Sequence, residues 1–173
     1  MSIHIVVDGY NLIRQSDRFR TLDRQDIQTG REALIDALAA YKKIKRHKIT
    51  VIFDGGNAPS LAPNKDRIKG IDVRFSAQDE TADTVIKRIS TRDKEKILVV
   101  SSDREIVSYA ESQGASGISS AFFEEKIRLA SLLDSTPDEI EEAPGWIPTT
   151  RKKGPSRRPS RMKRRQRLKT DKL

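Results

Sequence analysis

The sequence contains no cysteine, which excludes disulfide bonds, thiol catalysis and zinc sites built from cysteine ligands. It also has no apolar run long enough for a transmembrane helix. Residues 1–10 do not combine a basic start with an apolar stretch of signal-peptide length. These absences predict a cytoplasmic protein without membrane contact.

Charge is divided unevenly along the chain of 173 residues, whose net charge is +9. Residues 144–173 hold 12 Lys or Arg and one acid, Asp171, so this segment carries +11. The remaining 143 residues are slightly acidic, at −2. Such asymmetry predicts a globular domain with a basic arm for a polyanion.

Short runs rich in Ile and Val alternate with segments of helical spacing. The runs predict strands at 3–7, 49–53, 71–75 and 97–100, with a brief fifth strand at 117–119. The helical spacing predicts helices at 27–44, 81–89, 102–113 and 122–133. This order of elements predicts an α/β fold, in which a doubly wound parallel sheet is flanked by helices.

The composition changes after residue 134. We predict a domain over 1–134, an acidic and then Pro-containing linker over 135–150, and a basic tail over 151–173. The tail has almost no apolar residues, so it cannot bury enough surface to order itself. We therefore predict that the tail is disordered.

Acidic side chains follow three of the predicted strands, at Asp8, Asp54 and Asp103. In a doubly wound sheet, ligands bind beyond the carboxyl ends of the strands, where the strand order reverses. If the first strand lies between the second and fourth, these three carboxylates converge at one edge. Glu80 and Asp83 are spaced to share one face in the first turn of the next helix.

Carboxylates in one pocket repel each other, by about 4 kcal/mol per pair at about 4 Å and an effective dielectric constant near 20. Either some protons stay bound or a cation neutralises the group. Hard oxygen ligands suit Mg²⁺ or Mn²⁺, and these ions activate water and stabilise charge on a phosphodiester. The acids therefore predict metal-dependent phosphodiester hydrolysis.

Each motif also has a purely structural interpretation. Asp8-Gly9-Tyr10-Asn11 is a favourable turn sequence, and Asp54-Gly55 suits an ordinary strand-to-loop turn. Ser102, with Glu105 three residues later, matches a capping box. The conjunction of the acids, rather than any single motif, favours catalysis.

Neither histidine is predicted to bind a metal. His4 lies within the first predicted strand, where a core or edge position is expected. His47 precedes the second predicted strand, and we expect it to be exposed.

Residues 5–13, Ile-Val-Val-Asp-Gly-Tyr-Asn-Leu-Ile, resemble the opening strand and signature of NYN domains, a branch of the PIN-like nucleases. Residues 51–55, 80–83 and 101–103 resemble later blocks of that group in the same order, in particular those of the bacterial YacP-like NYN proteins. The resemblance covers about residues 3–133 and leaves out the tail. It implies a PIN-like fold and an endoribonuclease activity that depends on Mg²⁺ or Mn²⁺.

The resemblance also implies roles for individual residues. Asp8, Asp83 and Asp103 would be the central metal ligands, and Glu80 would be a further ligand or support one. Asn11 would orient Asp8 or a metal-bound water. The pocket around these residues would be shaped by Asp54, Ser101 and Ser102.

The tail carries Lys and Arg without interleaved aromatic residues, which suits phosphate contact rather than base stacking. We expect it to bind RNA or a ribosome surface, and the alternative is a solubilising tail with no partner. The expected RNA contacts are Arg151, Lys152, Lys153, Arg157, Arg158, Arg161, Lys163, Arg164, Arg165 and Arg167.

Two functional hypotheses follow. In the first, the protein is an endoribonuclease that cuts single-stranded RNA with metal-activated water. In the second, it is a non-catalytic module with a PIN-like fold that binds RNA or ribosomes. A phosphatase or receiver-type phosphoacceptor is a weaker third, because no lysine stands near Asp103 to serve such a site.

Overall fold

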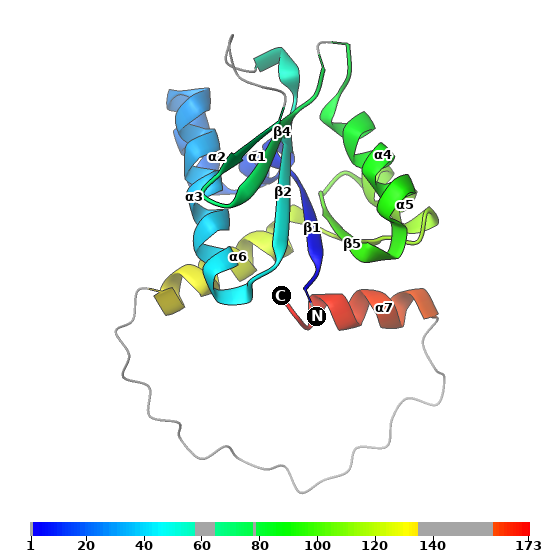
Figure 1. Ribbon diagram of the computed structural model, residues 1–173. Coiled ribbons are helices and arrows are strands. Elements are labelled where there is room, and N and C mark those ends of the chain that lie inside the picture. The colour runs from blue at the N-terminus through cyan, green and yellow to red at the C-terminus, as the bar shows by residue number, and fades with distance from the viewer. Residues whose placement is uncertain (1, 58–64, 78, 135–160) are drawn as a thin grey trace, which may run out of the picture.

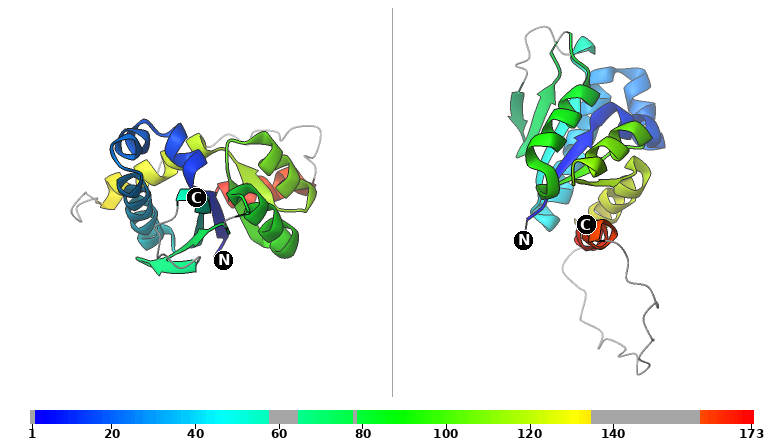
Figure 2. Two further views of the ribbon diagram at one scale, coloured as in Figure 1. Left: turned by 90° about the horizontal axis from the view of Figure 1, so that it is seen from above. Right: turned by 90° about the vertical axis from the view of Figure 1, so that its right-hand side faces the viewer.

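The computed structural model describes residues 2–57, 65–77, 79–134 and 161–173. A six-stranded sheet with the order β3-β4-β2-β1-β5-β6 forms its centre, and helices cover both faces (Figure 1, Figure 2). The predicted α/β fold is therefore confirmed. Strand β1 lies between β2 and β5, the arrangement that brings the carboxylates following these strands to one edge of the sheet.

All strand pairs are parallel except the pair of β3 and β4. The sequence did not reveal β3 because all four of its residues are exposed, which leaves no apolar alternation. The strands are β1 (His4–Asp8), β2 (Lys48–Phe53), β3 (Lys65–Ile68), β4 (Ile71–Phe75), β5 (Ile97–Val100) and β6 (Ser116–Ile118).

The helices include two that the sequence did not reveal, α1 and α2. They are α1 (Gly9–Gln15), α2 (Asp17–Gln25), α3 (Ile27–Lys45), α4 (Ala82–Asp93), α5 (Arg104–Ser112), α6 (Ser120–Asp134) and α7 (Arg161–Thr170), with short 3₁₀ turns at Gly55–Asn57 and Lys94–Lys96. In the described ranges, none of these helices combines the length and apolar character needed to cross a bilayer.

The interpretation of Asp8-Gly9-Tyr10-Asn11 as a turn is wrong, because Gly9 begins helix α1. A Cβ atom at Gly9 would lie 2.3 Å from Cε1 of Phe53 and 3.0 Å from the carbonyl oxygen of Ile52. Real Cβ atoms do not approach other atoms so closely, so this glycine permits α1 to pack directly against β2. The close approach fixes where Asp8 stands.

Apolar side chains alternate between the two faces of the sheet and form two cores. Ile5 and Val7 of β1 belong to the core that includes residues of α1, α2, α3 and α6. Val6 belongs to the second core, with residues of α4 and α5. This period of two is expected for strands covered on both faces, and it holds the carboxyl ends of the strands rigidly together.

The prediction of a disordered tail over 151–173 is wrong for residues 161–173, and residues 151–160 lie outside the described part. Helix α7 lies at the amino ends of the strands, close to the N-terminus (Figure 1). Gln166 Nε2 donates to the carbonyl oxygen of Gly117 (2.6 Å), and Lys169 Nζ donates to that of Ile97 (2.7 Å). Leu173 is buried. These tertiary contacts stabilise a segment whose own composition could not.

His47 is buried, so the prediction of a surface histidine is wrong. Its Nδ1 accepts the backbone N–H of Ile3 at 3.4 Å, and its Nε2 lies 3.2 Å from the carbonyl oxygen of Lys172. The C-terminal residues therefore cover a side chain that would otherwise be open to solvent.

Candidate active site

Asp8 ends β1 and caps the N-terminus of α1. Its side chain is buried, with 9% of the residue's surface exposed. Oδ1 accepts the backbone N–H of Asn11 (3.3 Å), and Oδ2 accepts the hydroxyl of Ser101 (3.1 Å). Burial raises the pKa of Asp8 to about 6, and the nearby charges of Asp54 and Asp103 add to the rise, whereas the two hydrogen bonds oppose it.

The side chain of Asn11 forms hydrogen bonds with both of the loops that follow β5 and β6. Its Oδ1 accepts the backbone N–H of Ser102 (2.8 Å) and the hydroxyl of Ser120 (2.8 Å). The backbone N–H of Ser120 donates to the hydroxyl of Ser102 at 3.1 Å. The side chain of Asn11 thus positions the two loops beside Asp8, while its backbone N–H donates to the Asp8 carboxylate directly. No local sequence signal identified Ser120, because its partners lie far away in the chain.

Asp54 follows β2 and anchors the start of α4. Its Oδ1 accepts the backbone N–H of Ala82 at 2.7 Å. The neighbouring Gly55 allows the loop to close, since a Cβ there would lie 2.0 Å from the carbonyl oxygen of Ser76. Asp54 therefore positions the helix that carries Asp83.

Asp103 follows β5 and caps α5. Its Oδ1 accepts the backbone N–H of Glu105 at 2.8 Å, and Asp103 is exposed. The prediction of Ser102 as the capping residue is wrong, because the Ser102 hydroxyl is used by Ser120. The backbone N–H of Asp103 also donates to the Ser101 hydroxyl (3.1 Å), which links it to Asp8.

Two cations of α4 pair with the remaining predicted acids. Lys87 Nζ lies 3.1 Å from Oδ2 of Asp83 and 2.5 Å from Oε1 of Glu105. Arg88 holds Glu80 through two contacts, of 2.8 and 3.2 Å. Lys87 was not predicted from the sequence, although its spacing of four residues from Asp83 on a helix is a signal for such a pair.

A cavity of about 590 Å³ adjoins Asp103. It extends from Ser102 and Asp103 past Phe122 to Gln166 and Thr170 of α7. The carboxyl end of the sheet thus combines buried negative charge with an open cavity that reaches the basic C-terminal helix.

Comparison with known proteins identifies the family. The model of the YacP-like NYN domain matches residues 5–169. The chain belongs to the YacP-like NYN family. NYN domains are nuclease-like, so the family is of nuclease type. The match extends beyond the expected residues 3–133 and includes α7 up to residue 169.

Two kinds of relative accompany this match to the NYN family. The uncharacterized protein YacP of Bacillus subtilis (strain 168) is 27% identical over 86 residues, which is 50% of each chain. The chain thus spans about half the length of this curated relative. The crystal structure of Rae1 (YacP) from Bacillus subtilis covers 78% of each chain at 25% identity, with a TM-score of 0.65. A variant of that protein gives a TM-score of 0.61 at 23% identity, over 75% of this chain and 77% of the other.

The donor chemistry of this NYN site fits a hard divalent cation. The carboxylate of Asp8 is buried, and Oδ1 of Asp83 is buried without a hydrogen-bond partner among the described residues. Carboxylate and hydroxyl oxygens are the ligands that Mg²⁺ and Mn²⁺ prefer. The acids do not, however, converge as a set of three within the described ranges, because Asp83 and Glu80 face Lys87 and Arg88.

Proposed function

We propose that this NYN protein is an endoribonuclease that hydrolyses phosphodiester bonds of single-stranded RNA with the help of Mg²⁺ or Mn²⁺. The observation that carries the proposal is the buried Asp8, with a pKa of about 6, next to the carboxylates of Asp54 and Asp103. Uncompensated negative charge is costly in a folded protein, and a divalent cation would neutralise it. The nuclease-type family supports the same reaction class.

Asp8, Asp83 and Asp103 would hold the ion, with Glu80 supporting them. A bound Mg²⁺ or Mn²⁺ would supply an activated water and would stabilise charge on the phosphate. Ser101 and Asn11 keep the carboxylate of Asp8 in one orientation through the hydrogen bonds described above. Such fixed orientation is what second partners of metal ligands provide.

The cavity of about 590 Å³ beside Asp103 would receive the RNA strand. Phe122 lines this cavity, and Lys126 Nζ lies 5.2 Å from the centre of its ring. Aromatic stacking is the usual means of holding the bases of single strands. Lys163, Arg164 and Arg167 are exposed on α7, where contact with RNA phosphates or with a ribosome surface is proposed. In the cell we propose a cytoplasmic location.

The test is cleavage of single-stranded RNA by the purified full-length chain with Mn²⁺ or Mg²⁺. Asp8→Asn and Asp103→Asn should each lower the rate by about 100-fold or more. Asp66→Asn is the matched control, since Asp66 is an exposed acid on β3, and its rate should match that of the wild type. Undiminished cleavage by both site variants would show that the assignment is wrong.

A second candidate function is a non-catalytic RNA- or ribosome-binding module. The pairing of Asp83 with Lys87 and of Glu80 with Arg88 favours it, because these acids are already neutralised without a metal. In that case the wild-type chain would bind RNA tightly and cut none of a varied set of RNAs with either metal.

A further inference from the structure

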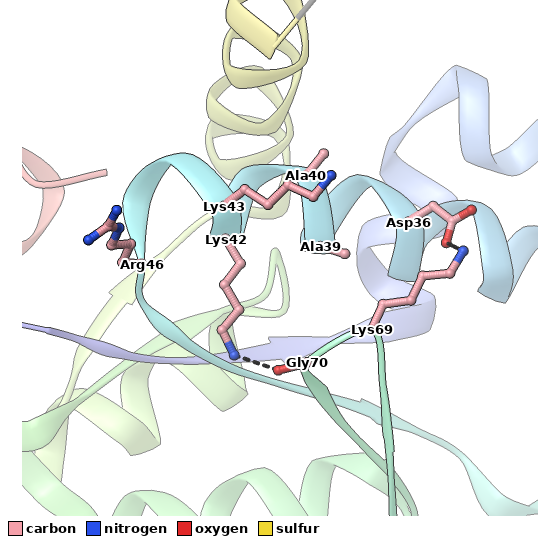
Figure 3. Close-up of a pocket in the computed structure, with 8 residues that line it drawn as sticks. All are labelled: Asp36, Ala39, Ala40, Lys42, Lys43, Arg46, Lys69 and Gly70. Atoms are coloured by element: carbon pink, nitrogen blue, oxygen red, sulfur yellow. Dashed lines mark hydrogen bonds and ion pairs between the residues drawn. The ribbon is translucent and has the colours of Figure 1, made fainter.

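A second cavity lies away from the acids, between α3 and the turn that joins β3 to β4 (Figure 3). Its volume is about 860 Å³. The residues that line it are Asp36, Ala39, Ala40, Lys42, Lys43, Arg46, Lys69 and Gly70. Four of these eight residues are cationic and one is acidic, so the pocket carries a strong positive charge.

The cations come from two segments that the fold brings together. Lys42 Nζ donates to the carbonyl oxygen of Gly70 at 2.5 Å, which ties α3 to the turn (Figure 3). Lys69 pairs with Asp36, so the one acid of the pocket is neutralised. Lys43 and Arg46 are exposed, and neither forms an ion pair with any residue in the described ranges. The ammonium group of Lys43 and the guanidinium group of Arg46 are therefore available to a ligand.

A structural explanation covers only part of this charge. Cations in the last turn of a helix interact favourably with its dipole, and Lys42 and Lys43 stand in the last turn of α3. Lys69, however, belongs to the turn before β4, and Arg46 follows the helix with a positive φ of 52°. The helix dipole therefore does not account for Lys69. At Arg46, the C-cap of α3, it favours a cation, although the positive φ there favours glycine over arginine.

The pocket faces the opposite end of the sheet from the candidate active site. Arg46 and Gly70 precede β2 and β4, whereas Asp8, Asp54 and Asp103 follow their strands. Strands of this length span about 17–20 Å. One phosphodiester therefore cannot occupy both places, and a ligand of the pocket must be a different part of the RNA or a different molecule.

We propose that this pocket, formed by Lys42, Lys43, Arg46 and Lys69, binds the phosphate backbone of double-helical RNA and so docks the protein on a structured RNA. The inference rests on the proposed ribonuclease function, of which it specifies the kind of RNA that is engaged. Among the described residues, no aromatic side chain lines the pocket, so these residues offer no surface on which bases could stack as they do in single-strand sites. A cluster of cations without stacking partners suits an A-form duplex, which proteins contact mainly through its phosphates and 2′-hydroxyls.

The experiment measures binding of an RNA hairpin with a long duplex stem by fluorescence anisotropy, in EDTA, over a range of salt concentrations. The double variant Lys43→Gln and Arg46→Gln removes the two available cations. The slope of log K against the logarithm of the salt concentration should be less steep for this variant than for the wild type, by about 2, because two phosphate contacts are lost. Its affinity at moderate salt should fall about tenfold or more.

The matched control is Lys65→Gln with Arg128→Gln, which removes the same charge from exposed residues outside the pocket. It should keep the wild-type slope, and thermal melts should show that both double variants are folded. An equal loss in the control, an unchanged slope in the pocket variant, or no duplex binding by the wild type would overturn the proposal. Displacement of the hairpin by polyglutamate at equal charge would instead assign the pocket to acidic proteins and would also overturn it.

Cleavage of a short single-stranded RNA separates the two proposals. The pocket variant should cut it at the wild-type rate, because the pocket lies far from the acids. If the wild type cuts no RNA but the slope of duplex binding changes as expected, the proposed function fails and the docking pocket stands.

Discussion

The two ends of strand β1 each carry a titratable side chain whose pKa is shifted by burial, but the charges around the two side chains differ. At its amino end His4 is half-buried near Lys48 and Arg74, and its pKa is lowered to about 4, mainly by burial and then by Lys48. At its carboxyl end burial raises the pKa of Asp8 to about 6. Burial drives both groups toward their neutral forms. At His4 the cations Lys48 and Arg74 add to the shift while Asp93, whose Oδ2 lies 3.8 Å from Nδ1, and Asp72 oppose it; at Asp8 the neighbouring charges of Asp54 and Asp103 both add to it.

This difference extends over the whole sheet. The candidate active-site acids follow strands, whereas Arg46, Lys69 and the C-terminal helix α7 lie at the amino ends. The net charge of +9 is therefore distributed unevenly over the fold. The proposed divalent cation would bind among the acids that follow the strands, and the proposed phosphate contacts lie at the opposite end of the sheet.

The largest effect is expected from Asp8→Asn, measured as the free energy of unfolding in EDTA against pH. The pKa of Asp8 is about 6 in the folded chain, above its usual 3.8. As pH rises, the unfolded chain therefore loses this proton at a lower pH than the folded chain does. The free energy of unfolding should fall as pH rises from about 4 through 6, because the folded state holds the ionised carboxylate less favourably. The variant avoids this cost, so it should exceed the wild type by up to about 3 kcal/mol above pH 7.

Near pH 4 the advantage of Asp8→Asn should disappear. A difference between the two proteins that stays constant from pH 4 to 8 would contradict the perturbed carboxylate. Asp66→Asn, at an exposed acid, provides the baseline for an ordinary titration.

A smaller and opposite effect is expected from His4→Gln. The folded pKa of His4, about 4, is below its usual 6.5, so the unfolded chain binds the proton first as pH falls. The wild type should therefore lose stability between pH 6.5 and 4, by about 1–2 kcal/mol after allowance for partial exposure. Glutamine can still bond to Thr50, whose hydroxyl lies 2.9 Å from His4 Nε2.

Chemical denaturation at pH 7 and pH 4.5 measures this effect. The variant should gain on the wild type as pH falls, in the direction opposite to that of Asp8→Asn. Parallel loss of stability in both proteins would mean that His4 is protonated in the folded chain and that the amino end is less positive than described.

The smallest effect is expected from Lys87→Gln. Lys87 pairs with Asp83 and Glu105, and removing it leaves Asp83 free to bind a cation. Mn²⁺ should bind about two- to fivefold more tightly, in line with the modest energies of accessible ion pairs. Isothermal titration with Mn²⁺ measures this change, and Lys65→Gln is the control for net charge. Weaker binding in Lys87→Gln would show that Lys87 supports the metal rather than competing with it.

The sequence allowed most of the parallel sheet to be predicted, because β1, β2 and β5 are largely apolar runs buried on both faces and β4 alternates apolar with charged residues. The same periodicity placed the acids correctly after the strands. It could not reveal β3, which has no buried residue, or the docking of α7, which depends on contacts with Gly117 and Ile97.

The candidate site was predictable in its composition but not in its pairing. Asp8 and Asp103 were identified from their places after strands, and Ser101 links them. The partners of Asp83 and Asn11 depend on side-chain conformations and on residues distant in the chain, such as Ser120. Local sequence patterns do not predict such contacts.

The most direct test of the central claim is a crystal structure of the full-length chain soaked with Mn²⁺, analysed by anomalous scattering. We predict a peak beside Asp8 and Asp103, with Asp83 turned from Lys87 toward the ion. A structure at saturating Mn²⁺ without a peak among these three carboxylates, and with the pair of Asp83 and Lys87 intact, would contradict the account.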